Sequence, residues 1–258
     1  MEGWNEYTAL NAAEWDRRAR EGNVWTLPIS HDEFTQAKNG KWQVLLTPTR
    51  PVPIEWFPPL QGAKVLGLAS GGGQQCPIFV ARGAKVTVFD VSAKQLETEL
   101  IMGEREGYTV DLVKGDMTKP FPFADGIFDM VFHPVSNCYV RDVEHIWREA
   151  CRVLKPGGTL LAGFTNPAVY LFDANGDPTR VANRLPYDPL QLGDEAVKQA
   201  LARDGAIEFS HSLTTQIGGQ LRSGFTLLDM YEDIDREAAI AAYMPCYIAT
   251  RAVKRQQP

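Results

Sequence analysis

The chain has 258 residues, of which 44% are hydrophobic and 22% charged, and its formal net charge is −6. This composition is that of a globular protein large enough for one α/β domain with a cap. The acidic balance argues against a nucleic-acid surface, which needs a basic face. The four scattered cysteines contain no C-x-x-C pair, so they indicate neither a zinc site nor a disulfide framework.

The N-terminus lacks the basic-then-apolar pattern of a signal peptide, and no apolar run approaches bilayer length. We therefore expect a cytoplasmic protein with neither a membrane partner nor a nucleic-acid partner. No constellation of residues predicts a metal site, and nothing in the sequence indicates the oligomeric state.

Residues 1–60 are predicted to form an N-terminal extension. A helix is expected over 7–20, and the prolines of 48–59 favour extended chain there. Five of the six tryptophans precede residue 60, and most are expected to pin the extension onto the core. Trp25 is also a candidate wall of a ligand site.

From residue 63, apolar strands alternate with amphipathic helices. Helices are expected over 73–82, 92–106 and 140–154, and strands over 65–69, 85–90, 110–113, 128–132 and 159–164. Alternation of this kind predicts a parallel sheet with right-handed crossovers.

Residues 167–211 break this rhythm and are predicted to be an insertion after the fifth strand. Turn chemistry recurs at 175–178 and 185–189. A short helix is expected over 194–204 and a short strand over 207–210. A helix over 212–222 and strands over 225–231 and 247–253 follow. The expected fold is α/β: a Rossmann-like, seven-stranded, mostly parallel sheet with helices on both faces.

The first strand runs into three consecutive glycines, Gly71, Gly72 and Gly73. A buried strand, a glycine turn and a helix in that order are typical of nucleotide-like cofactor sites in parallel sheets. Glycine lets the backbone approach the ligand closely, and the N–H groups of the new helix face its polar groups.

Polar residues also end the next strands, where ligands of open parallel sheets bind. Asp90 closes the second strand about 20 residues after the glycines, where a carboxylate can accept both ribose hydroxyls. Asp116 ends the third strand, where an adenine would lie, and the fourth ends in residues 133–137. Together these residues predict an adenosine site.

The chain resembles the class I S-adenosylmethionine-dependent methyltransferases over about 60–165 and again over 212–253. The motifs that carry the resemblance are residues 65–73, 88–90, 115–117, 121–129 and 147–158, of which the last two are absent from NAD-binding proteins. The resemblance implies S-adenosyl-L-methionine as cofactor and makes residues 61–258 the methyltransferase domain, with 167–211 as its cap.

The resemblance also implies roles for individual residues. It places Asp90 on the ribose, Asp116 and Met117 at the adenine, and His133 beside the sulfonium end. The expected cofactor-binding residues are therefore Ser70, Gly71, Gly72, Gly73, Gln75, Asp90, Val91, Asp116, Met117 and His133.

Two residues depart from the family pattern, which usually has an acidic residue at position 67 and glycine at position 69. Here they are Gly67 and Ala69. The missing carboxylate removes one anchor for the methionyl ammonium. Gln74 and Gln75, at the start of the following helix, are candidate replacements.

Methyl transfer needs a donor and an acceptor held in line in a dry cavity more than it needs a reactive side chain. The extension 1–60 and the insertion 167–211 are the expected lids. Candidate substrate residues are Tyr7, Trp25, Asn137 and Asn166, with Trp15, Tyr170 and Phe172 as further walls. His133 is the candidate general base for an acceptor that must lose a proton.

The predicted function is methyl transfer to a small-molecule acceptor whose identity the sequence does not give. Two alternatives stay open at this point. An NAD(P)-dependent oxidoreductase also uses a glycine turn and a strand-end acid. The other is a non-catalytic protein that binds S-adenosylmethionine, which stays open because Gly67 and Ala69 depart from the family pattern.

Overall fold

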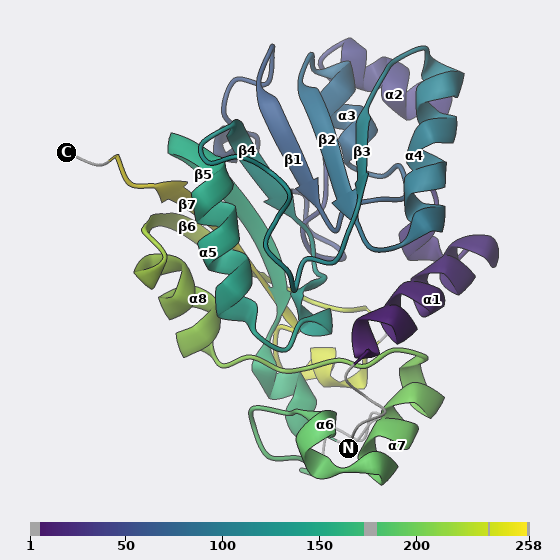
Figure 1. The fold of residues 1–258 in the computed structure, drawn as a ribbon, viewed down its shortest axis with the longest axis vertical. Helices are drawn as coiled ribbons and strands as arrows, with labels where there is room; N and C mark the ends of the chain where they lie inside the picture. The colour runs from purple at the N-terminus through teal and green to yellow at the C-terminus, as the bar shows by residue number, and fades with distance from the viewer. Residues whose placement is uncertain (1–5, 173–179, 237, 257–258) are drawn as a thin grey trace.

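The protein is described by a computed structural model that covers residues 6–172, 180–236 and 238–256. Its centre is a seven-stranded sheet in the order β3-β2-β1-β4-β5-β7-β6 (Figure 1). The strands are β1 (Lys64–Leu68), β2 (Lys85–Asp90), β3 (Asp111–Lys114), β4 (Phe128–His133), β5 (Leu154–Thr165), β6 (Phe225–Asp233) and β7 (Tyr247–Lys254). Strands β1 to β5 pair in parallel, and β7 is antiparallel to both β5 and β6.

Eight α-helices are assigned within the described residues. They are α1 (Tyr7–Arg20), α2 (His31–Lys38), α3 (Cys76–Ala81), α4 (Ala93–Glu106), α5 (Val143–Val153), α6 (Pro189–Leu192), α7 (Asp194–Asp204) and α8 (Leu213–Arg222). Among these helices none is long and apolar enough to cross a membrane.

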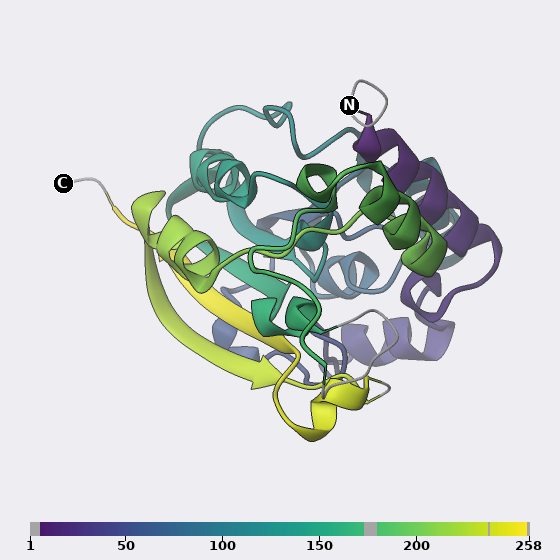
Figure 2. The ribbon, with the colours of Figure 1, turned by 90° about the horizontal axis from the view of Figure 1, so that it is seen from below.

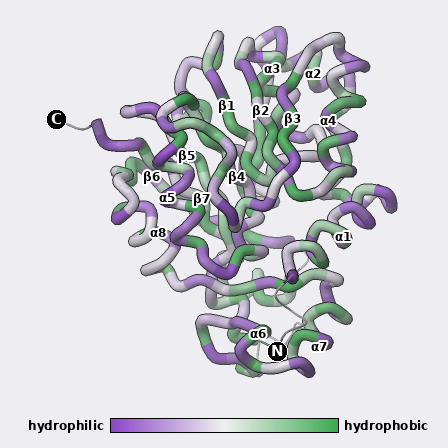
Figure 3. The backbone as a smooth tube through the Cα atoms, viewed as in Figure 1, coloured by the Kyte–Doolittle hydropathy of each residue, from purple (hydrophilic) through white to green (hydrophobic). Residues whose placement is uncertain are grey.

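The helices cover both faces of the sheet, because alternate residues of each strand point to opposite sides. On one face, Val65, Val88 and Phe132 pack with Phe79 of α3 and with the buried Trp56 of the extension. On the other, Leu66 and Val131 pack against α5, and α8 lies against α5. Figure 3 shows the hydrophobic residues concentrated in the central strands. The predicted seven-stranded, mostly parallel fold is confirmed.

The extension and the insertion meet beyond the carboxyl ends of the strands (Figures 1 and 2). Helix α1 lies beside α7, and the buried Asn11 exchanges two hydrogen bonds with the backbone of Ile207, at 3.0 Å and 2.7 Å. These contacts join residues about 200 positions apart and close one side of the space above the sheet.

Most predicted elements are present with boundaries shifted by a few residues. The strand expected over 207–210 is wrong: this segment is not in the sheet, and its backbone instead bonds singly to Cys138 and Tyr187. Helix α2 was not expected, and α3 begins at Cys76 rather than residue 73. The turn expected over 175–178 lies outside the described residues.

Candidate active site

The glycine turn after β1 is shaped by close packing against the neighbouring strand end and α4. A Cβ at position 71 would lie 2.8 Å from the Cβ of Gln95, which is closer than Cβ atoms in proteins come to other heavy atoms, and 3.0 Å from Oδ2 of Asp90. Only glycine therefore brings the backbone this near to the Asp90 carboxylate. The Gly71 N–H donates to that Oδ2 at 3.1 Å.

Asp90 lies at the carboxyl end of β2 and is buried. Its Oδ1 accepts from the Ser92 N–H at 2.9 Å. Burial raises the pKa of Asp90, whereas the N–H groups of Ser92 and Gly71 act in the opposite direction. Because a carboxylate has about four acceptor positions, the group can still accept from ligand hydroxyls.

A second buried carboxyl supports the turn from beneath. Oε1 of Glu99, in α4, accepts from the Gly73 N–H at 2.7 Å, and Oε2 has no partner in the structure. Burial raises the pKa of Glu99 to about 8. At neutral pH this side chain is therefore mostly an uncharged acid that fixes the backbone of the turn.

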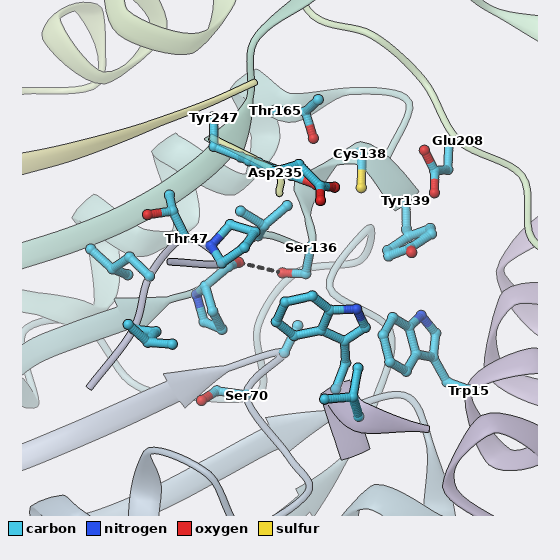
Figure 4. A pocket seen from close by; sticks show the side chains of 18 of the residues that line it. Trp15, Thr47, Ser70, Ser136, Cys138, Tyr139, Thr165, Glu208, Asp235 and Tyr247 are labelled. Carbon is cyan, nitrogen blue, oxygen red and sulfur yellow. Dashed lines mark hydrogen bonds between the residues drawn. The ribbon is translucent and has the colours of Figure 1, made fainter. Parts of the chain in front are cut away.

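A large cavity of about 1170 Å³ opens at this edge of the sheet. At one end it is lined by the glycine turn and by Asp90, Val91, Gln95 and Met117. At the other end it reaches Tyr139, Tyr170, Tyr187, Glu208, Asp235 and Tyr247. Figure 4 shows Ser70 on one side of this cavity and Glu208, Tyr139 and Cys138 on the other. One continuous space thus joins the predicted cofactor end to residues of the insertion.

Seven of the predicted site residues line the cavity. Six belong to the expected cofactor set and one to the expected substrate set: Ser70, Gly71, Gln75, Asp90, Val91, Met117 and Trp25. The wall candidates Trp15, Tyr170 and Phe172 line it too.

Three residues of the expected cofactor set support the site without lining the cavity. Gly72 packs over Gln95, so that a Cβ there would meet its side-chain oxygen at 2.8 Å. Gly73 is held by Glu99. The Asp116 carboxylate accepts from the Thr118 N–H at 2.8 Å and so stabilises its own turn.

The side chains of three expected substrate residues contact other parts of the protein instead of the cavity. Tyr7 packs edge-to-face on Phe209, with ring centroids 5.1 Å apart. Asn137 is buried and exchanges two hydrogen bonds with Gln216, at 3.1 Å and 3.2 Å. Asn166 donates to the Pro245 carbonyl and accepts from the Ala168 N–H. None of the three lines the cavity.

His133 is fully buried on the α5 face of the sheet. Its Nδ1 lies 3.0 Å from the Leu68 carbonyl oxygen, and its ring packs edge-to-face on Trp147. Because side chains alternate between the two faces of β4, His133 lies on the same face as Val131, away from the cavity. Burial lowers the pKa of His133 to about 4. Its position therefore gives no support to contact with the sulfonium or to a general-base role.

Sequence reasoning missed several residues of the lining. Gln95 is buried in α4, and its Oε1 has no hydrogen-bond partner among the described residues. Three other parts of the lining reach the cavity only through packing between distant parts of the chain. They are the segment 43–48, which contributes Thr47, and the residues Glu208 and Tyr247. The local signal for the cofactor end was strong, whereas these residues carry no motif.

No group of three or more His, Cys, Asp or Glu side chains in the described ranges is arranged to hold a metal ion. The donor set at the cavity instead fits an adenosine-like ligand. It combines a strand-end carboxylate, a glycine turn with close backbone approach, and an apolar Met117.

Comparisons with known proteins agree with this geometry. Residues 66–162 match the model of a family described as a methyltransferase domain. The chain is 44% identical over 254 residues to the uncharacterised methyltransferase YbaJ of Bacillus subtilis, covering 97% of this chain and 99% of that protein. The chain belongs to the class I S-adenosylmethionine-dependent methyltransferases. Its cofactor is S-adenosylmethionine.

Two solved structures show the same fold. An S-adenosylmethionine-dependent methyltransferase from Mesorhizobium loti has a TM-score of 0.60 at 21% identity, covering 78% of this chain and 94% of that one. A Burkholderia thailandensis 1,6-didemethyltoxoflavin-N1-methyltransferase, with 1,6-didemethyltoxoflavin and S-adenosylhomocysteine bound, has a TM-score of 0.57 at 14% identity, covering 97% of this chain and 90% of that one.

Membership of this methyltransferase family sets aside the oxidoreductase and non-catalytic alternatives, and the structure explains the two motif departures. A Cβ at Gly67 would lie 2.5 Å from Sγ of the buried Cys76, so no acidic side chain fits there unless Cys76 moves. Ala69 adopts φ of 48°, the left-handed region that favours glycine. Alanine adopts this conformation at a strain of about 1 kcal/mol.

Proposed function

We propose that this methyltransferase acts on a small organic acceptor held in the cavity between the sheet edge and the two flanking segments. The observation that carries the proposal is the continuity of this cavity from Asp90 to Tyr170 and Tyr247. A space of this size accommodates a cofactor and a small molecule together. The neighbour from Burkholderia thailandensis, whose structure has 1,6-didemethyltoxoflavin bound, supports the same class.

In this proposal the cofactor end works by hydrogen bonding. S-adenosylmethionine supplies the electrophilic methyl group. Asp90 would accept the ribose hydroxyls, and Val91 and Met117 would contact the adenine. Ser70, Gly71 and Gln75 would face the methionyl part, where Gln75 offers an amide in place of the missing acid. The buried Ser70 hydroxyl donates to Oε1 of Gln75 at 3.0 Å, which orients that amide.

The flanking segments would act as lids that exclude water. Trp15 and Trp25 from the extension, and Tyr170 and Phe172 from the insertion, surround the cavity with aromatic surface. Since methyl transfer disperses positive charge, a dry and close-fitting site can accelerate it mainly by alignment. The boundaries 1–60 and 167–211 describe these two lids.

Two measurements test the proposal. Titration calorimetry should show that S-adenosylhomocysteine binds and NADH does not. Release of S-adenosylhomocysteine from S-adenosylmethionine should then be followed over a library of small acceptors, with a tRNA pool and a denatured protein as comparison acceptors. Turnover confined to small molecules is the expected result. Turnover on the macromolecules alone would refute the small-molecule acceptor and leave the cofactor assignment intact.

A further inference from the structure

Three acidic side chains line the acceptor end of the cavity: Asp204, Glu208 and Asp235. Glu208 lies in the segment that follows α7, and the Phe209 N–H donates to the Cys138 carbonyl at 2.7 Å. This bond holds the segment over the carboxyl end of β4. Figure 4 shows Glu208 beside Cys138 and Tyr139. The Tyr170 hydroxyl donates to its Oε2 at 2.8 Å.

The cations that line the same end are paired with other groups. Arg18 lies 2.7 Å from Glu14 and also donates to the Asp204 carbonyl, and Arg203 is paired with the Asp204 carboxylate. Among the hydrogen bonds and ion pairs of the described residues, Glu208 has the Tyr170 hydroxyl and no basic partner. Burial, followed by the nearby Asp204, raises the pKa of Glu208, whereas the Tyr170 hydroxyl and the charges of Arg203 and Arg18 act in the opposite direction.

An enclosed carboxylate that no cation contacts directly is costly, and a ligand that brings a positive charge into contact with it offsets the cost. Hydrogen bonds between a carboxylate and a charged N–H donor are about twice as strong as neutral ones. The geometry at Glu208 therefore favours a cationic nitrogen over a neutral or anionic group.

Aromatic rings next to this carboxylate favour the same ligand. Tyr170 and Tyr187 are stacked, with centroids 5.9 Å apart and planes at 19°. Tyr139 packs edge-to-face on Trp15, at 5.8 Å. Ring faces attract cations and flat apolar groups alike.

We propose that Glu208, oriented by Tyr170, binds a protonated nitrogen of the methyl acceptor, so that the acceptor is an organic amine with an aromatic body. This inference rests on the proposed small-molecule function. It concerns the nitrogen that anchors the acceptor and leaves open which atom receives the methyl group.

The test uses the full chain saturated with S-adenosylhomocysteine. Calorimetry compares tryptamine with tryptophol, and benzylamine with benzyl alcohol, so that each pair differs only in ammonium against hydroxyl. At least one amine should bind tenfold or more tightly than its alcohol. In E208Q this preference should fall below threefold, and in Y170F it should weaken by a smaller factor.

E33Q is the matched control. Glu33 also lines the cavity, but its carboxylate is engaged with Ser30 at the start of α2, so the amine preference should persist in this variant. Unchanged S-adenosylhomocysteine affinity in E208Q shows that the variant is folded.

Three results would overturn the inference. They are no binding by either amine, equal binding by amine and alcohol, and a preference that survives in E208Q. If S-adenosylhomocysteine itself fails to bind, the proposed function falls as well. If it binds and amines are not preferred, only the role of Glu208 falls.

Discussion

Glu99 links the stability of the fold to pH through the glycine turn. Its pKa rises from 4.5 to about 8 on folding, because the carboxyl is buried beneath Gly73. Below pH 4.5 the group is protonated in both folded and unfolded chains. Between pH 4.5 and 8 the unfolded chain releases the proton and the folded chain keeps it. The free energy of unfolding therefore falls as the pH rises, by about 1.4 kcal/mol per pH unit at most.

The variant Glu99→Gln isolates this effect. The amide oxygen of the glutamine can still accept from the Gly73 N–H. Because glutamine does not ionise, this position no longer makes the stability of the variant depend on pH. The stability of the variant relative to the parent should therefore increase by about 2.5 kcal/mol between pH 5 and pH 7. Urea unfolding at several pH values measures both proteins. Glu104→Gln, which removes an exposed carboxyl from the same helix, is the control.

A stability difference between Glu99→Gln and the parent that stays constant from pH 5 to pH 7 would refute the reasoning. It would mean that the carboxyl is ionised in the folded protein. Water or a cation would then have to reach Oε2, which has no partner within the part of the chain that the structure describes.

Four other outcomes are expected. Asp90→Ala should weaken S-adenosylhomocysteine binding by about 1–3 kcal/mol, and an unchanged dissociation constant in a folded variant would refute the ribose assignment. Deletion of residues 1–30 should impair turnover, and full activity would show that this segment only packs. The imidazole of His133 should give no NMR titration between pH 5 and 8, because burial lowers its pKa to about 4, and a midpoint near 6.5 would contradict its buried position. Asn11→Ala should lower the free energy of unfolding by about 2 kcal/mol in urea unfolding, since the buried N–H and carbonyl of Ile207 lose their partner; a loss below 0.5 kcal/mol would contradict this role.

The cofactor end could be predicted from sequence because each of its parts is local. Strand β2 was predicted with its observed ends, 85–90, since a glycine at 83 and the capping Ser92 bracket an apolar run. Asp90 then follows from the register of parallel strands, which brings their carboxyl ends to one edge. Helix α2 has a local signal too, because Ser30 and Glu33 form a capping box at its start.

The predicted site residues that do not line the cavity depend on partners far along the chain or on the face of a strand. His133 ends β4 as expected, yet alternation turns its side chain toward Trp147. The side chain of Asn137 is hydrogen-bonded to Gln216, which lies 79 positions away in the sequence. Neither outcome follows from local spacing. The side chain of His133 faces Trp147 because of the alternation of side chains along β4, and Asn137 meets Gln216 because α8 packs against α5.

Glu208 shows why the acceptor end resists prediction. Its segment has the apolar alternation of a strand, but it does not enter the sheet. The Phe209 N–H instead bonds to Cys138, and Asn11 holds the neighbouring Ile207. Both contacts require that the extension, the loop after β4 and the insertion are already assembled. The chemistry that selects the acceptor is thus built from the parts of the chain with the longest-range contacts, whereas the chemistry that holds the cofactor is built from consecutive strand ends. Substitutions in the insertion can therefore change which acceptor binds while Asp90 and the glycine turn keep their geometry.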